Sequence, residues 1–135
     1  MTTPEGQSAT NLKGKRGLKR LINATGYSIK GIRAGLASEA AFREECLLAV
    51  VLIPVALLLP VTVVEKVLLI NAVLLLLLVE ILNSAVEAAV DRVGMEIHPL
   101  AGRAKDMASA AVFFALLIGA VTWGAIALPA IWGLF

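Results

Sequence analysis

The sequence predicts an all-α membrane protein in which an amphipathic surface helix precedes three membrane-spanning helices. Hydrophobic residues make up 59% of its 135 positions, and the mean hydropathy is +0.89. Ordinary soluble domains contain roughly 45–50% apolar residues. Long uncharged runs alternate with short charged clusters, as in chains that cross a bilayer several times. At this length the chain is expected to form a 1–15 leader and one membrane domain, 16–135.

Residues 16–36 are predicted to form a basic amphipathic helix after a disordered leader. The apolar residues from Leu18 to Leu36 fall within about 100° of one another on a helical projection. The opposite side collects Arg16, Lys19, Arg20, Asn23, Tyr27, Lys30 and Arg33. Such a helix lies at a membrane surface with its charges toward anionic lipid or phosphate. A plain electrostatic anchor fits this pattern, and so does a site where Arg20 or Tyr27 touches a nucleotide or lipid headgroup.

The first membrane span is predicted over about 39–64. Ser38 is expected to cap this helix, with Glu39 in its first turn, where the helix dipole favours an acid. Residues 46–64 are nineteen positions without a charge, and a hydrocarbon core needs about 20. Pro54 and Pro60 are expected to kink or end the helix.

The second span is predicted over about 66–93, after a tight turn at Glu65 and Lys66. Residues 67–79 are apolar apart from Asn71, but these thirteen residues are too few to cross alone. The helix must therefore continue through Glu80, so acidic residues begin inside the membrane or at its inner edge.

The third span is predicted over about 103–128. Gly94 is expected to end the preceding helix, and residues 95–102 to form a loop. Residues 107–135 contain no charge, so this helix crosses completely. Trp123 and Trp132 are expected to be interfacial aromatic residues on the far side.

The distribution of Lys and Arg predicts the orientation. Eight of the twelve precede the uncharged run 46–64, one directly follows it, and three lie between the apolar runs 67–79 and 107–135. The positive-inside rule places the N-terminus and the second loop in the cytoplasm. The acidic residues at the ends of the spans then face the compartment that contains ATP.

A row of polar residues in the second span is the main indication of function. In a helix, Asn83, Glu87 and Asp91 fall roughly 60°, 20° and 20° from Glu80, so all four share one stripe. Several acids on one side of a membrane helix are expected to line a site for cations or polar substrate. Proton or cation pathways use such rows, and so does structural pairing with Arg92, Arg103 and Lys105; neither is excluded by the spacing.

The same residues are sufficient for metal-assisted phosphate transfer. Glu39 and Glu87 could hold Mg²⁺, which takes oxygen ligands and substrate phosphates. Glu80 could accept a proton from an attacking hydroxyl, while Lys105 and Arg20 offset phosphate charge. The sequence contains no Gly-x-x-x-x-Gly-Lys-Ser/Thr loop, so a nucleotide site would differ from that of P-loop enzymes.

The acidic row is part of a longer motif that resembles a known family. Residues 80–92 read Glu-Ile-Leu-Asn-Ser-Ala-Val-Glu-Ala-Ala-Val-Asp-Arg, and residues 98–112 read His-Pro-Leu-Ala-Gly-Arg-Ala-Lys-Asp-Met-Ala-Ser-Ala-Ala-Val. Together with 24–33 and 39–45, these segments resemble the signature of the small prokaryotic diacylglycerol kinases. The resemblance covers about residues 20–123.

The resemblance implies a bacterial inner-membrane homotrimer with active sites shared between subunits at the cytoplasmic face. It implies phosphorylation of diacylglycerol by ATP with Mg²⁺, and no nucleic-acid partner. Glu80 and Asn83 match catalytic positions, and Glu39 and Glu87 match metal ligands. The positions that match nucleotide contacts are Arg20, Tyr27, Glu39, Glu87, Glu96, Ile97, His98, Lys105 and Asp106. Those that match lipid contacts are Arg20, Ala24, Tyr27, Ser28, Ile29, Arg33, Ala41, Phe42, Glu45, Glu80 and Ser109.

A sibling branch of this family phosphorylates undecaprenol, a polyprenyl alcohol, by what should be the same chemistry. The amphipathic helix and the Glu-Ala-Ala-Phe-Arg pattern at 39–43 look closer to the diacylglycerol branch. Diacylglycerol is therefore the expected substrate, with undecaprenol as the alternative.

Overall fold

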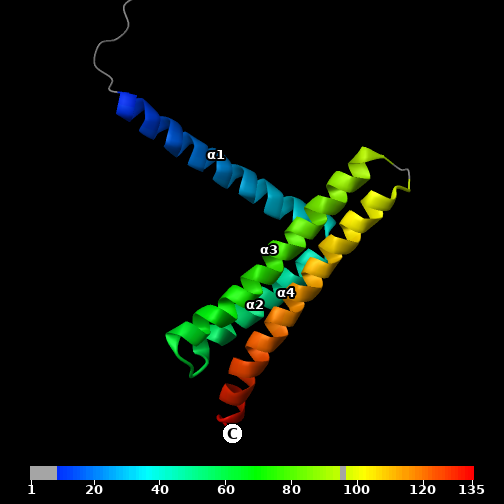
Figure 1. Ribbon diagram of the computed structural model, residues 1–135. Helices are drawn as coiled ribbons and strands as arrows, with labels where there is room; N and C mark the ends of the chain where they lie inside the picture. Colours follow the sequence, from blue (N-terminus) through cyan, green and yellow to red (C-terminus); the bar gives the residue numbers. More distant parts are fainter. Residues whose placement is uncertain (1–8, 95–96) are drawn as a thin grey trace, which may run out of the picture.

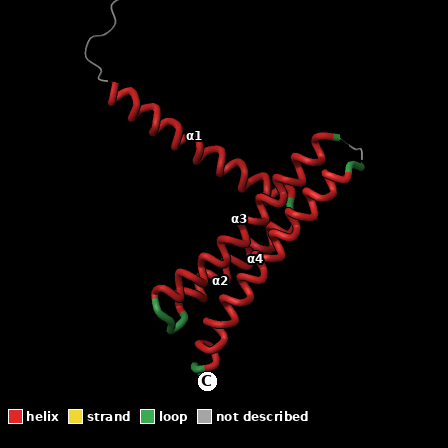
Figure 2. Tube along the Cα trace, viewed as in Figure 1, coloured by secondary structure: helices red, strands yellow, loops and turns green. Residues whose placement is uncertain are grey.

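The described part of the chain forms four helices. The computed structural model describes residues 9–94 and 97–135, with side chains from residue 14 onward. The helices are α1 (Ala9–Ser38), α2 (Ala40–Leu58), α3 (Val63–Val93) and α4 (Pro99–Trp132). Helix α3 packs along both α2 and α4, whereas α1 leaves this bundle at an angle (Figure 1). No strand occurs among the described residues (Figure 2), so the all-α prediction is confirmed.

Helix α1 begins earlier than predicted and ends in a sharp corner. Residues 9–15, assigned to the leader from sequence, are helical, and residues 1–8 lie outside the described part. The predicted cap at Ser38 is wrong, because its hydroxyl donates to the Ala34 carbonyl at 2.9 Å within α1. Glu39 is the residue between the helices, in extended conformation, and occupies the N-cap position of α2.

Side chains of α2 hold this corner in place. Gly35 is buried, and a Cβ added there would lie 2.9 Å from Cδ1 of Phe42 and 3.6 Å from Cδ1 of Ile81. Arg43 Nη1 donates to the carbonyl oxygens of Leu36 (3.0 Å) and Ala37 (3.2 Å). These carbonyls lie in the last turn of α1, where intrahelical partners are absent. The corner is therefore packed and hydrogen-bonded, and it meets α3 near Ile81.

Helix α2 is shorter than the predicted first span. It ends at Leu58, and Leu59 is extended with φ −63° and ψ 142°. Pro60 explains this end, because a proline disfavours the helical conformation of the preceding residue. The uncharged part of α2 therefore covers residues 46–58, and Pro54 lies inside the helix.

The predicted turn at Glu65 and Lys66 is wrong by a few residues. The connection is 59–62, and both charged residues lie in α3. Thr62 Oγ1 accepts from the Glu65 backbone N–H at 3.2 Å, and the Glu65 carboxylate accepts from the Thr62 N–H at 2.8 Å. This capping box starts α3. Lys66 Nζ donates to the Leu57 carbonyl at 2.6 Å, which satisfies the C-terminal end of α2.

Helices α3 and α4 are long and apolar enough to cross a membrane, so two of the three predicted spans are supported. Helix α3 continues through Glu80 to Val93, as predicted, and Gly94 is its C-cap. Helix α4 starts four residues before the predicted position 103. His98 is its N-cap: Nδ1 accepts from the Leu100 N–H at 3.1 Å, and Pro99 occupies the first turn. Proline suits this turn because its missing N–H leaves no donor unpaired.

The protein buries few apolar side chains and exposes many. Its main core cluster consists of Ala56, Leu59, Leu69 and Ala127. Trp123 packs against this cluster, and its indole N–H donates to the Leu69 carbonyl at 3.2 Å. Trp123 therefore joins α4 to α3. Leu, Val and Phe side chains along the bundle face outward, as expected for helices covered by lipid or by further copies of the chain.

Candidate active site

The centre of the acidic row is a buried carboxylate. Glu80 is 6% exposed, and no other charged side chain among the described residues is buried. It lies midway along α3, next to Ile81, which faces the α1–α2 corner. Burying a carboxylate is costly unless a partner stabilises it, and no hydrogen bond from another described residue reaches the Glu80 side chain. A position of this kind is typical of a functional group.

Three further carboxylates surround Glu80. The charges of Glu39 at the corner and Glu87 two turns along α3 both act on it. Glu45, one to two turns into α2, is also close enough for its charge to interact with Glu80. The structure thus brings together four of the predicted site residues from two helices and the corner between them.

Two atoms at this site are buried without a partner. Neither Glu45 Oε2 nor Asn83 Oδ1 has a hydrogen-bond partner among the described residues. Asn83 lies one turn beyond Glu80 on α3. Buried polar groups in proteins are almost always hydrogen-bonded, so these oxygens are suited to contact a bound molecule.

A salt bridge stands at the end of the acidic row. Lys105 Nζ of α4 donates to Asp91 Oδ1 of α3 at 2.5 Å. Lys105 is also near enough to Glu87 for their charges to attract. From the sequence, Asp91 could pair with any of several basic residues nearby. The structure identifies Lys105 as its partner. Asp106 is exposed beside it.

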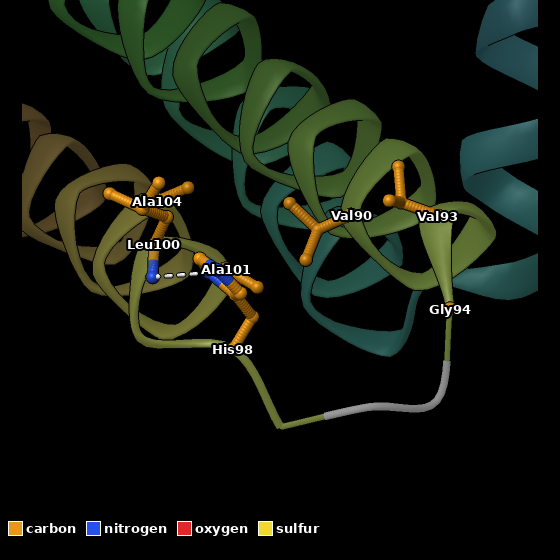
Figure 3. A pocket seen from close by; sticks show the side chains of 7 residues that line it. All are labelled: Val90, Val93, Gly94, His98, Leu100, Ala101 and Ala104. Carbon is orange, nitrogen blue, oxygen red and sulfur yellow. Dashed lines mark hydrogen bonds between the residues drawn. The ribbon is translucent and has the colours of Figure 1, made fainter.

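A cavity of about 790 Å³ lies between the end of α3 and the start of α4. It is lined by Val90, Val93, Gly94, His98, Leu100, Ala101 and Ala104 (Figure 3). The volume is within the range of small-molecule sites, which are mostly apolar with a few polar groups. Apart from His98, these residues were not identified from sequence, because small and branched apolar residues carry no signal that separates a cavity wall from a packed helix face.

The residues predicted on the surface helix do not join this cluster within one chain. Arg20, Ala24, Tyr27, Ser28, Ile29 and Arg33 are all exposed on α1. Arg20 is fifteen residues before Gly35, which is about 22 Å along a helix, on the part of α1 that runs away from the bundle (Figure 1). Lys30 Nζ lies 5.8 Å from the Tyr27 ring centroid.

The remaining residues predicted to contact lipid or nucleotide differ in how exposed they are. Phe42 is 4% exposed and packs against Gly35, so in this structure it joins helices and has little surface left for lipid. Ala41 and Ser109 are exposed, and so is Ile97. Glu96 lies outside the described residues.

The carboxylates alone do not form a complete metal centre. Within the described residues, no group of three or more His, Cys, Asp or Glu side chains is arranged to hold a metal ion. This arrangement still fits Mg²⁺, because that ion is commonly bound by one or two carboxylates together with water and substrate phosphates. Glu39 and Glu87, whose charges both act on Glu80, are the pair that could supply those oxygens.

The fold and the site define an all-helical membrane protein with a cluster of carboxylates and a cavity toward one end of its helices. The model of the prokaryotic diacylglycerol kinase family matches residues 26–127. A diacylglycerol kinase of Pseudomonas aeruginosa is 57% identical over 121 residues, which cover 90% of this chain and 98% of that protein. Those of Haemophilus influenzae and Escherichia coli are 52% and 51% identical, over 82% and 79% of this chain and 93% and 88% of their own lengths.

The chain belongs to the prokaryotic diacylglycerol kinase family. This confirms the predicted family and its enzyme class, a phosphotransferase that acts on a lipid. The apolar helices α3 and α4 agree with a membrane protein.

Proposed function

We propose that this protein transfers the terminal phosphate of ATP to the free hydroxyl of diacylglycerol and so forms phosphatidic acid. The observation that carries the proposal is the buried Glu80, which is surrounded by Glu39, Glu45 and Glu87 in a chain of this family. The three relatives described above are named diacylglycerol kinases, which favours this lipid over undecaprenol.

Glu80 is proposed as the general base. Its burial limits the access of water to the carboxylate, which reduces competition between solvent and the lipid hydroxyl for the proton-accepting oxygen. Asn83, one turn away, has a buried oxygen without a partner and can accept a hydrogen bond from substrate. Glu39 and Glu87 would hold Mg²⁺, which neutralises phosphate charge when bound.

The nucleotide is proposed to bind at the end of the α3–α4 pair. The apolar cavity beside His98 suits the flat face of a base, and the Lys105 ammonium and Glu87 lie on the side toward the acidic row. Asp106, Glu96 and Ile97 are proposed as further contacts because they match the family's nucleotide-binding positions. Lys105 would offset the negative charge of the phosphates.

The lipid is proposed to lie along α2, α3 and α4, in an apolar cavity that begins at Glu45. A second cavity, of about 200 Å³, is lined by apolar residues of α2, α3 and α4, including Leu48, Leu76 and Trp123, with Glu45 as its one acidic residue. An acyl chain fits such a lining, and the Glu45 oxygen without a partner would face the glycerol backbone. Ala41 and Ser109 are proposed as further lipid contacts.

A homotrimer is proposed to complete the site. Arg20 and Tyr27 extend on α1 beyond their own bundle, so contacts between them and phosphate would be made at the site of a neighbouring copy. Exposed apolar side chains on α2 and α4 offer the surface for such an assembly. We place the N-terminus and the acidic site at the cytoplasmic face of a bacterial inner membrane, with α2 as the first of the three spans.

The direct test is a phosphate-transfer assay with purified protein, Mg²⁺ and labelled ATP. Parallel mixed micelles contain diacylglycerol, undecaprenol or neither. We expect label in phosphatidic acid alone. Label found only in undecaprenyl phosphate would identify undecaprenol, and not diacylglycerol, as the substrate. Absence of transfer to both lipids, combined with ion flux in proteoliposomes, would instead favour a cation pathway through the acidic row.

A further inference from the structure

The salt bridge between Asp91 and Lys105 joins the two helices that flank the proposed nucleotide site. Asp91 lies in the last turn of α3, one turn beyond Glu87 and on the same face, and Lys105 lies in the second turn of α4. Their contact at 2.5 Å is the one salt bridge among the described residues.

This pair is not what holds α3 and α4 together. The side chains are 40% exposed for Lys105 and 65% exposed for Asp91, and ion pairs in contact with water contribute little to stability because water screens them. The two helices are joined elsewhere by apolar packing around Leu69 and Ala127 and by the Trp123 hydrogen bond. The pair is therefore available for a role other than joining the helices.

The contact restricts a long side chain at the point where phosphate is proposed to bind. A lysine ammonium has three N–H donors, and Asp91 accepts one of them. Two donors remain for phosphate oxygens, and the ammonium stays near Glu87. Without Asp91, the four-carbon stem would have to be ordered each time a nucleotide binds, and ordering a free lysine side chain opposes binding.

We infer that Asp91 is a positioning residue that holds the Lys105 ammonium in place for the phosphates of the nucleotide. This inference rests on the proposed function and deepens it, since it adds a residue that acts through Lys105 without touching the substrate. It predicts that Asp91 affects nucleotide affinity and leaves lipid affinity unchanged.

The test is a double-mutant cycle with Asp91→Asn, Lys105→Met and the double variant, in full-length protein in mixed micelles. KM for MgATP and kcat are measured at saturating diacylglycerol, and KM for diacylglycerol at saturating ATP. We expect Asp91→Asn to raise KM for MgATP roughly three- to fivefold, the size of effect that an exposed ion pair supports, with kcat changed less. In the Lys105→Met background, Asp91→Asn should have no further effect, because residues that act as a pair are not additive.

Two additional variants separate positioning from structure. Asp91→Glu keeps a carboxylate within reach of Lys105 and should restore most of the nucleotide affinity. Glu44→Gln removes an exposed acid of α2 and serves as the matched control, with unchanged KM values. Thermal unfolding of each variant in detergent should give midpoints close to the parent.

The outcomes are distinguishable. If Lys105→Met leaves KM for MgATP unchanged, the proposed nucleotide role of Lys105 is wrong, and the inference falls with it. If Lys105→Met raises KM but Asp91→Asn has the same effect in both backgrounds, Asp91 acts independently and only the inference is overturned. A lower unfolding midpoint for Asp91→Asn with unchanged KM would identify the pair as structural, and would also overturn it.

Discussion

Gly35 of α1 lies against the ring of Phe42 of α2, so closely that a Cβ added at Gly35 would stand 2.9 Å from Cδ1 of the ring. The absence of a side chain at Gly35 thus allows the surface helix to meet the bundle. Ile81, the residue after Glu80, completes this contact. The direction in which α1 leaves the bundle is therefore determined directly beside the buried carboxylate.

Gly35→Leu should destabilise the protein by about 1–3 kcal/mol, the usual effect of overpacking a closed contact. Gly31→Leu is the matched control, because nothing lies within 4 Å of a Cβ added there, and replacing a helical glycine is otherwise favourable by roughly 1 kcal/mol. Thermal unfolding in detergent measures both. Equal midpoints for the two variants would show that the corner is loose in solution.

Glu80→Gln should lower kcat by a hundredfold or more, since positioned general bases contribute about 10²–10⁴-fold. The amide has nearly the same shape as the carboxylate, and it removes a buried charge, so the folded state should be retained. Nucleotide affinity, measured by equilibrium binding of MgATP, should stay close to that of the parent. Near-normal turnover would remove Glu80 as the base.

Glu87→Gln should instead weaken the binding of Mg²⁺. Loss of one carboxylate oxygen ligand weakens Mg²⁺ binding, and we expect the Mg²⁺ concentration for half-maximal activity to rise about tenfold or more. Chelation by EDTA should stop the parent enzyme, and added Mg²⁺ should restore it. Titration of activity with Mg²⁺ at fixed ATP gives the measurement. An unchanged Mg²⁺ requirement in Glu87→Gln would exclude this residue as a ligand.

Trp123→Phe should destabilise the helical bundle by about 1 kcal/mol, because the Leu69 carbonyl loses the indole N–H donor. Trp132→Phe is the control, since Trp132 is 85% exposed at the end of α4. Unfolding midpoints in detergent should fall for the first variant and stay constant for the second. Equal effects would show that the hydrogen bond does not contribute.

The helices themselves could be predicted from the sequence, because apolar periodicity and charge-free length are local properties. Helix α3 had to pass through Glu80 since thirteen apolar residues cannot span a bilayer, and it does. The ends of the helices could be predicted only in part. Ser38 was expected as a cap from its residue type, but its hydroxyl bonds back within α1. Pro60 was expected to kink or end the first span, and it ends α2 through a steric effect on Leu59.

The site was predictable in part. Acids at helical spacing identify Glu80 and Glu87 as neighbours on one face, and the family motif adds Glu39. The partner of Asp91 was not predictable, because Arg92, Arg103 and Lys105 are equally plausible from spacing; only the packing of α4 on α3 selects Lys105. The same packing creates the cavity beside His98.

The connection at 59–62 bears on how the chain enters a bilayer. Thr62 and Glu65 satisfy each other, and Lys66 donates to the Leu57 carbonyl near the end of α2. A connection that meets its own hydrogen-bonding needs is less costly to carry through hydrocarbon than an open loop, since unpaired polar groups are penalised there. Helices α2 and α3 are thus suited to insert together as one hairpin, before α4 follows.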